Sequence, residues 1–446
     1  MLGKTATRRG ARVREIIDVP KKTDTTMASL DMKSRVASLV FVVPALLVVS
    51  LAICAPPARA RSWGELVLHS FDGTDGSDPL ARLIRGSDGN FYGTTAGGDG
   101  MVFQLTPSGT LTTLYQFCSV FDPSTDNCTD GANPFGGVIQ GRDSNFYGTT
   151  IAGGTNFWGN VFQLTPSGTL TILYSFCNVL DPSMEVCTDG ANPDAGVIQG
   201  SDGNFYGTTY LGGTIGGGTA YRLTPSGTLT ILYSFCSKTN CVDGAFPYAG
   251  VVQRSDGNFY GTTTSGGGPN NGGTVFKLTP SGALTTLHSF CSKTNCSDGQ
   301  YPYGGLIQGR DGNFYGTTLI GGKNEQGTVF KITPSGRLTT LHSFTGGTDG
   351  ESPFAGLVQG RDGNFYGTAF GGGAKQAGTL FKITPSGTFT TLYSFCSQAV
   401  CADGESPYGG LVQGSGGKFY GTTSGGANGY GTVFEVGASL RRRHLP

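Results

Sequence analysis

The sequence predicts an all-β protein, a single seven-bladed β-propeller of four-stranded antiparallel blades over residues 62–437. The string Asn-Phe-Tyr-Gly-Thr recurs about every 55 residues. Each repeat of about 55 residues contains four short runs rich in β-branched and aromatic residues, with turn residues between them. No stretch after residue 60 has a sustained helical period. Seven repeats of four antiparallel strands match the blades of a propeller. The string begins at Asn90, Asn145, Asn204, Asn258, Asn313 and Asn364, with an altered seventh copy at Lys418.

The repeat at residues 305–344 illustrates the order of elements within a blade. Asp-Gly-Asn at 311–313 supplies the positive φ of a tight hairpin between the first and second strands. Thr-Pro-Ser-Gly at 333–336 turns the chain between the third and fourth strands, because Pro presets φ and Gly ends the turn. A glycine-rich gap joins the second strand to the third. The four runs are 305–308, 314–318, 327–332 and 338–344.

The two ends of the repeat region predict how the ring closes. The last repeat ends after Val436 and lacks its fourth strand, whereas residues 65–71 before the first repeat match that missing strand. We therefore expect the N-terminal strand to complete the last blade. A linear solenoid is the alternative, but it would need polar caps rather than complementary ends.

The repeat resembles a known family. Its consensus G-[LV]-[IV]-Q-x-x-D-G-N-F-Y-G-T-T, followed by G-T-V-F-K-[LI]-T-P-S-G and L-T-x-L-[YH]-S-F, is similar to the GloVer tandem repeat of choice-of-anchor bacterial surface proteins. The likeness covers nearly all of the chain after residue 62. It implies an exported bacterial protein, often with a C-terminal sorting anchor. The basic tail at 438–446 has no apolar segment of that kind.

The N-terminal region reads as an export signal. Residues 1–60 are an extension plus a signal peptide, with an apolar run at 36–55 and cleavage after Ala60. We expect translation to start at Met27 or Met32, because the segment before them is polar and basic. An uncleaved membrane anchor is the alternative. Cleavage would leave a mature protein without a membrane span, either secreted, periplasmic or on the bacterial cell surface.

Composition limits the partners. Glycine accounts for 76 of the 446 residues and only 13% are charged, but 37% are hydrophobic, which is enough for a core. Residues 1–60 hold ten basic and four acidic residues, so the remainder has a formal net charge of −6. Nucleic acid is not an expected partner, because phosphate binding needs clustered Lys and Arg.

Ten of the eleven cysteines fall into five local pairs, while Cys54 lies in the export segment. Each pair lies between the end of one repeat's fourth strand and the Asp-Gly before the next first strand. The two remaining loops of this kind lack both cysteines, so we predict five disulfides. A metal site is the alternative, but two thiolates without a nearby His do not make a tetrahedral site. The pairs are Cys118/Cys128, Cys177/Cys187, Cys236/Cys241, Cys291/Cys296 and Cys396/Cys401.

Several polar features could bind a metal or take part in catalysis, but each also has a structural interpretation. The Asp-Gly steps recur in all seven repeats, which is typical of turn formers. Two longer loops, Asp122-x-Ser124-x-Asp126 and Asp181-x-Ser183-x-Glu185, space oxygen ligands as some calcium loops do, without a full ligand set. We therefore expect no metal and no cofactor, with calcium as the alternative. His69, His288 and His342 lie in different repeats and are not expected to converge.

Candidate binding residues lie where the repeats differ. A residue follows Pro at the start of each first strand, which lines the central channel in propellers. An aromatic ring with one carboxylate there would suit a sugar or a peptide, and packing between blades is the alternative. Arg82, Arg85 and Arg254 depart from the repeat nearby and could orient an acidic ligand. The residues after Pro are Phe135, Tyr248, Tyr303, Phe354 and Tyr408, with Asp194 and Leu80 in the other two repeats.

The sequence thus favours an exported binding propeller that recognises an extracellular carbohydrate or protein partner through one disulfide-stiffened face of loops. One alternative is a polysaccharide-acting enzyme, a lyase or glycosidase, at the channel mouth. A second alternative is a structural or adhesive surface protein. We do not expect an enzyme, because no catalytic constellation is present in the motifs.

Overall fold

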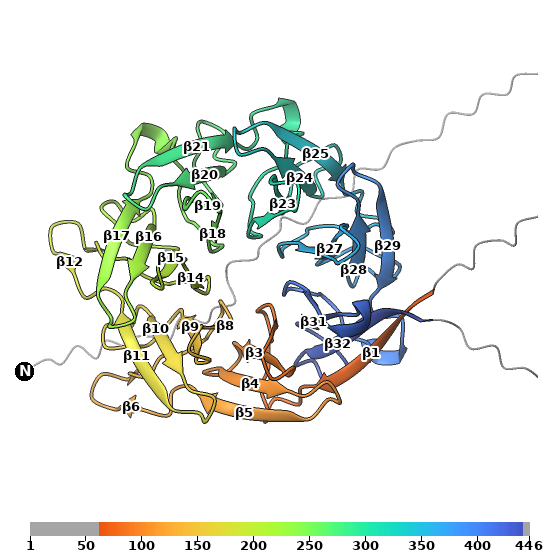
Figure 1. Cartoon of the computed structure of the whole chain (residues 1–446), viewed down its shortest axis with the longest axis horizontal. Coiled ribbons are helices and arrows are strands. Elements are labelled where there is room, and N and C mark those ends of the chain that lie inside the picture. Colours follow the sequence, from red (N-terminus) through yellow and green to blue (C-terminus); the bar gives the residue numbers. More distant parts are fainter. Residues whose placement is uncertain (1–61, 440–446) are drawn as a thin grey trace, which may run out of the picture. The chain divides into compact units, whose positions relative to one another are not determined.

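The computed structural model describes residues 62–439, and these form a closed ring of seven four-stranded antiparallel sheets (Figure 1). The predicted fold class is confirmed. The predicted export signal, its cleavage site, the start codon, Cys54 and the end of the basic tail lie outside the described residues. No helix among the described residues is long and apolar enough to cross a membrane.

The blades follow one another in chain order, each with its first strand nearest the axis of the ring (Figure 1). Blade 1 has β2 (Ile84–Arg85), β3 (Phe91–Thr95), β4 (Met101–Leu105) and β5 (Leu111–Gln116). Blade 2 has β8 (Val138–Gln140), β9 (Phe146–Thr150), β10 (Asn160–Leu164) and β11 (Leu170–Ser175). Blade 3 has β14 (Ile198–Gln199), β15 (Phe205–Thr209), β16 (Thr219–Leu223) and β17 (Leu229–Ser234). Blade 4 has β18 (Val252–Gln253), β19 (Phe259–Thr263), β20 (Thr274–Leu278) and β21 (Leu284–Ser289).

The remaining blades repeat this order. Blade 5 has β22 (Ile307–Gln308), β23 (Phe314–Thr318), β24 (Thr328–Ile332) and β25 (Leu338–Ser343). Blade 6 has β26 (Val358–Gln359), β27 (Phe365–Ala369), β28 (Thr379–Ile383) and β29 (Phe389–Ser394). Blade 7 has β30 (Val412–Gln413), β31 (Phe419–Thr423), β32 (Thr432–Ser439) and β1 (Ser62–Ser70). The loops add hairpins β6–β7 (Phe121–Asp122, Asn127–Cys128) and β12–β13 (Leu180–Asp181, Val186–Cys187), and 3-10 turns η1 (Thr239–Cys241), η2 (Thr294–Cys296), η3 (Ala399–Cys401) and η4 (Ser415–Gly417).

The N-terminal strand closes the ring, as predicted. β1 pairs antiparallel with β32, in a register that places Glu65 opposite Val436 and Ser70 opposite Thr432. β32 continues to Ser439, two residues beyond the predicted end of the propeller. Pairing the first and last described strands in one blade closes the ring, so only the outer strand of each blade keeps an unpaired edge.

The Asn-Phe-Tyr-Gly string is explained by contacts between blades. In every blade the Tyr ring of strand two contacts the Phe ring of strand two in the next blade, with ring centroids 3.8–4.3 Å apart. Tyr420 of blade 7 contacts Phe91 of blade 1, so this belt of aromatic pairs runs without a break across the closure. A side chain at Gly93 would place its Cβ 2.6 Å from the Phe103 ring, which explains the glycine that follows Tyr.

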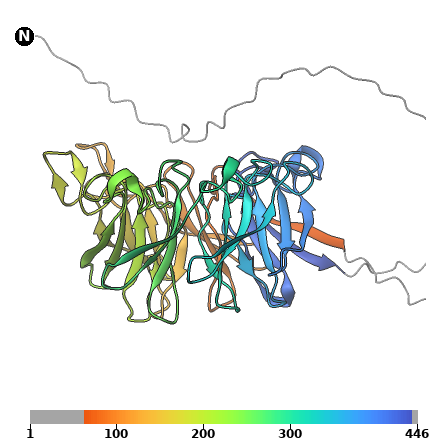
Figure 2. The same cartoon turned by 90° about the horizontal axis from the view of Figure 1, so that it is seen from above.

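The two faces of the ring are built from different connections. The loops between a blade's second and third strands (intrablade loops) and those from a fourth strand to the next first strand (interblade loops) share one face, the loop face. The tight Asp-Gly-Asn and Thr-Pro-Ser-Gly turns share the other, the turn face. Figure 2 shows the ring edge-on, with the longer loops along its upper edge.

Candidate functional site

A cavity of about 510 Å³ occupies the centre of the ring, within the usual size range of ligand sites. The first strands of the blades and the residues just before them form its wall. All seven residues that follow Pro lie on this wall, from Leu80 to Tyr408, and so does Arg82. The structure therefore brings together most of the predicted site residues, although their mutual arrangement differs from an open ring.

The five aromatic residues after Pro pack on one another across the axis at the loop face. Tyr248 lies at the centre of this aromatic layer, with its ring centroid 4.9 Å from that of Tyr303 and 5.6 Å from that of Phe354. The hydroxyl groups of Tyr248 and Tyr408 are hydrogen-bonded at 3.0 Å, which joins blade 4 to blade 7. Phe135 contacts both of these tyrosines. The rings thus converge at one end of the channel instead of standing apart around a mouth.

Asp194 is the one carboxylate on the cavity wall among the described residues. It replaces an aromatic residue in blade 3, next to the aromatic layer. Burial raises the pKa of Asp194 to about 7, and its negative charge in turn raises the pKa of Tyr210 after the larger effect of burial. A carboxyl group with a pKa near 7 can exchange a proton at physiological pH.

Arg82 is the one cation on the cavity wall in the described part of the chain. The six other blades have glycine at this position: Gly137, Gly196, Gly250, Gly305, Gly356 and Gly410. The Arg82 side chain lies along Gly410 of blade 7. It is exposed to the channel, yet the surrounding protein lowers its pKa, because a charge inside the ring is poorly solvated.

Arg85 and Arg254 lie at the turn face, away from the aromatic layer. Arg254 forms an ion pair with Asp256 of its own turn, at 2.7 Å. Arg85 replaces a glutamine that the other six blades share. That glutamine is structural, since the Gln140 side-chain oxygen accepts a hydrogen bond from the Ser87 backbone N–H of the preceding blade. The structure therefore separates Arg85 and Arg254 from Arg82 and from the residues that follow Pro.

All five predicted cysteine pairs are bonded, from Cys118–Cys128 to Cys396–Cys401. Each disulfide closes an interblade loop. In blades 1 and 2 the closed loop also contains the hairpins β6–β7 and β12–β13. Five disulfides indicate a non-cytoplasmic protein, because thiols stay reduced in the cytoplasm.

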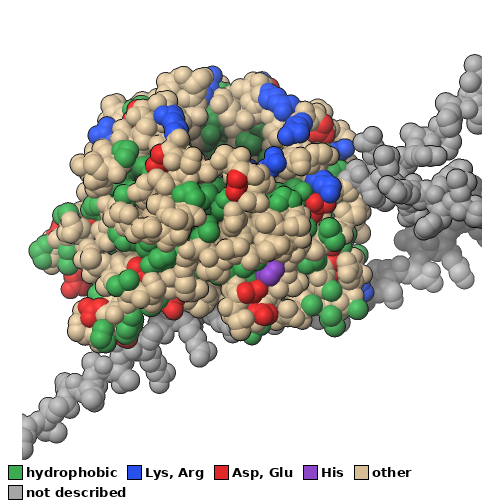
Figure 3. Space-filling model, turned by 60° about the horizontal axis from the view of Figure 1, so that its bottom comes forward, with side chains coloured by type: hydrophobic (Ala, Val, Ile, Leu, Met, Phe, Trp, Pro, Cys, Tyr) green, Lys and Arg blue, Asp and Glu red, His purple; other side chains and the backbone are tan. Residues whose placement is uncertain are grey.

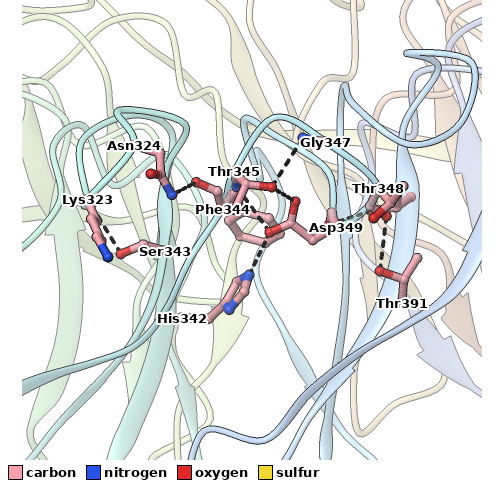
Figure 4. Close-up of polar contacts among 11 residues, drawn as sticks. Lys323, Asn324, His342, Ser343, Phe344, Thr345, Gly347, Thr348, Asp349 and Thr391 are labelled. Carbon is pink, nitrogen blue, oxygen red and sulfur yellow. Dashed lines mark hydrogen bonds and ion pairs between the residues drawn. The ribbon is translucent and has the colours of Figure 1, made fainter. Parts of the chain in front are cut away.

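The Asp of each Asp-Gly step organises an interblade loop. In blade 5, His342 of β25 bonds to Asp349 at 3.0 Å, and the backbone N–H of Thr345 donates to the same carboxylate (Figure 4). In blade 3, Tyr233 takes the place of the histidine and donates to Asp243 at 2.7 Å. Tyr and His interchange at this position because each can donate one hydrogen bond to the carboxylate. The histidines and these aspartates have a structural role on separate blades.

The two calcium-like loops use their first carboxylate locally. Asp122 accepts hydrogen bonds from the backbone N–H and hydroxyl of Ser124, at 2.9 and 2.7 Å. Asp181 accepts the same two bonds from Ser183. This is the geometry of an Asx turn, which lowers the pKa of both carboxyl groups by hydrogen bonding. Calcium binding at the Asp122 and Asp181 loops stays an alternative prediction.

Exposed large apolar side chains gather on the loop face. Eight of them lie on four neighbouring loops of blades 1–3, and we call these the hairpin patch. Hydrogen bonds join the four loops, for example from the Asn127 amide to the Gly154 carbonyl and from the Asn192 N–H to the Trp158 carbonyl. The hairpin patch comprises Val120, Phe121, Phe157, Trp158, Val179, Leu180, Met184 and Ile215.

Phe157 of the hairpin patch is held in an unusual backbone conformation. Its φ is +73°, in the left-handed region that bulky residues rarely adopt. Other blades place Gly216, Asn271, Glu325 or Gln376 at the corresponding position of the intrablade loop. The loop thus presents a half-exposed aromatic side chain at a position where blades 3–6 have glycine or a polar residue.

These features define a disulfide-stabilised seven-bladed propeller with a closed aromatic layer over its channel. The chain belongs to the Gloeobacter/Verrucomicrobia repeat family, whose pattern matches residues 121–295 and 291–443. No protein of curated function matches the sequence.

Solved structures are similar to this chain at low identity. A periplasmic gluconolactonase of Pseudomonas aeruginosa is 16% identical with a TM-score of 0.43, over 74% of this chain and 95% of that one. An aldose sugar dehydrogenase of Streptomyces coelicolor is 12% identical with a TM-score of 0.42, over 86% and 99%. The extracellular domain of a one-component system of Bacteroides thetaiotaomicron is 13% identical with a TM-score of 0.49, over 86% of this chain and 43% of that one.

Proposed function

We propose that the protein is an exported binding propeller that holds a protein partner on its loop face. The hairpin patch is the observation that carries this proposal. Eleven of the twelve exposed large apolar residues in the described chain lie in loops of this face, and Leu66 is the exception. Apolar groups gathered on one surface are typical of an interaction site, because water contact with them is unfavourable.

Charge around the hairpin patch indicates the chemistry of the partner. Asp122, Asp126, Asp181 and Glu185 lie on the same two hairpins as the apolar residues, and the hairpins contain no Lys or Arg. A complementary surface would combine apolar side chains with surrounding lysines or arginines. The disulfides Cys118–Cys128 and Cys177–Cys187 restrict both hairpins before binding, which reduces the entropy lost on association.

Carbohydrate binding and glycosidase activity are the weaker alternatives, for the following reasons. A carbohydrate would stack on open aromatic faces, whereas the rings of Tyr248, Tyr303 and Phe354 cover one another. A glycosidase would need two carboxyl groups about 5–10 Å apart, and Asp194 is the one carboxylate on the described cavity wall. A structural or adhesive role would require the same face to bind a second copy of the chain.

The test compares the wild-type mature protein with a variant of the hairpin patch. Phe157→Glu with Trp158→Gln introduces the residues that blade 5 has at Glu325 and Gln326, so the loop conformation is compatible with them. Val400→Asn is the matched control, since Val400 is exposed in another interblade loop and Asn240 and Asn295 occupy the corresponding positions.

Each protein is immobilised and exposed to envelope and secreted proteins of the producing bacterium, and to a glycan array. We expect the double variant to capture at least tenfold less of a partner protein than the wild type, and Val400→Asn to capture as much as the wild type. Equal capture by the double variant would refute the proposed surface. Binding of glycans alone would support the carbohydrate alternative, and self-association alone would support the adhesive one.

A further inference from the structure

The two faces of the ring differ in their balance of charge. Lys and Arg outnumber the carboxylates at the turn face, although each of blades 1–6 has one Asp in its turn and Arg254, Lys331 and Lys418 are ion-paired there. Acidic residues dominate the loop face, whereas most Lys and Arg of the described chain lie on or beside the tight turns. In Figure 3 Lys and Arg side chains gather around the hollow in the upper part of the view, and acidic side chains lie along the lower edge. The basic residues near the turn face are Arg85, Arg142, Arg222, Arg254, Lys277, Arg310, Lys331, Arg337, Arg361, Lys382 and Lys418.

The central cavity is closed at one end and apolar along its walls. The aromatic layer around Tyr248 spans the loop-face end, through the Tyr248–Tyr408 hydrogen bond. Between this layer and Gln253 near the turn face, the wall consists mainly of small and aliphatic residues, including Ile198 and Ile307. A ligand would therefore enter from the basic turn face.

Arg82 is the feature of this cavity that lacks a structural explanation. Its guanidinium has no hydrogen bond and no ion pair with any described residue, and it replaces a glycine that suffices in the other six blades. Asp194 lies on the same wall, but no ion pair joins it to Arg82, and burial alone accounts for its raised pKa. The Arg82 side chain is exposed to the channel and not packed into the wall, so a role in packing does not explain it.

We propose that the channel binds a small organic carboxylate, which Arg82 holds by its charged end. The planar guanidinium can donate two parallel hydrogen bonds to a carboxylate, and the aliphatic wall and aromatic layer would cover the carbon part of the ligand. The Lys and Arg of the turn face raise the local concentration of anions at the entrance. This site is separate from the hairpin patch and does not depend on the proposed protein partner.

The experiment measures binding of benzoate, hexanoate and glucuronate to the full mature protein by calorimetry and ligand-observed NMR. Benzyl alcohol, hexanol and glucose are the neutral counterparts, and inorganic phosphate tests for an unspecific anion effect. We expect at least one carboxylate to bind at least tenfold more tightly than its neutral counterpart and than phosphate.

Two variants take their residues from the repeat itself, so they are compatible with the blade. Arg82→Gly introduces the residue of the other six blades and should lower carboxylate affinity at least tenfold, whereas Arg82→Lys should retain part of it. Arg85→Gln, at the turn face, should keep the preference for carboxylate and weaken its dependence on salt. Unfolding curves confirm that each variant is folded.

Three outcomes would overturn the proposal. They are the absence of binding by all three carboxylates at millimolar concentration, equal binding of the neutral counterparts or phosphate, and unchanged affinity in folded Arg82→Gly.

Discussion

Glu65 provides the sharpest test of how this ring is held closed. It lies on β1, opposite Val436, at a position where the other six blades have Leu111, Leu170, Leu229, Leu284, Leu338 and Phe389. Both carboxyl oxygens are buried and have no hydrogen-bond partner. Burial, and secondarily the charge of Asp403, raise the pKa of Glu65 from 4.5 to about 8.

The direction of the pH effect follows from the two pKa values. Between pH 4.5 and 8 the unfolded chain has lost the proton while the folded protein keeps it, so the folded state loses stability as pH rises through this window. The full shift corresponds to about 5 kcal/mol at about 1.4 kcal/mol per pKa unit. Since β1 is an outer strand and Glu65 is only half-buried as a whole residue, solvent screening reduces this, and we expect about 2 kcal/mol.

The assay is equilibrium unfolding by denaturant at pH 5, 6.5 and 8.5, with disulfides intact. Glu65→Leu, which restores the residue of the repeat, should gain about 2 kcal/mol more over the wild type at pH 8.5 than at pH 5. Glu65→Gln keeps the size and polarity but cannot titrate, so its stability should also depend less on pH. A gain from Glu65→Leu that is equal at pH 5 and pH 8.5 would refute the reasoning.

Two further predictions concern the interblade loops. Asp243 is fully buried and accepts hydrogen bonds from Tyr233, Ser237 and Lys238. Asp243→Ala leaves these donors unpaired, so it should lower the free energy of unfolding by denaturant by about 3 kcal/mol. A decrease below about 0.5 kcal/mol would contradict the structural role. Alkylation of the mature protein should label ten additional thiols only after reduction, and the Cys236→Ser, Cys241→Ser variant should lose about 2 kcal/mol. Ten reactive thiols before reduction would disprove the disulfides.

Much of the fold follows from the sequence because its signals are local and repeated. Asp-Gly-Asn and Thr-Pro-Ser-Gly act within a few residues, and the Phe-Tyr pair contacts the same pair one blade away. Pairs of cysteines five or ten residues apart can be matched without knowing the fold. The missing strand of the last repeat even predicts ring closure, since the matching strand stands at the other end.

The proposed binding surfaces are less predictable from the sequence because they depend on residues far apart in it. The post-proline residues were recognised, but only the ring brings Tyr248 and Tyr408 within hydrogen-bond distance, and so turns an open ring of aromatics into a closed layer. The hairpin patch likewise arises because loops of consecutive blades meet on one face. Arg82 and Arg85 are three residues apart, yet Arg82 lies on the channel wall and Arg85 lies at the turn face.

The sequence by itself determined the number of blades, their strands and turns, the disulfides and the closure, because each depends on a short motif repeated at a fixed interval. The tertiary structure decided which residues share the axis, which end of the channel is closed, and that Arg82 and Glu65 lie unpaired where the repeat has Gly and Leu. Those properties depend on seven blades meeting around one axis, and no single repeat contains that geometry.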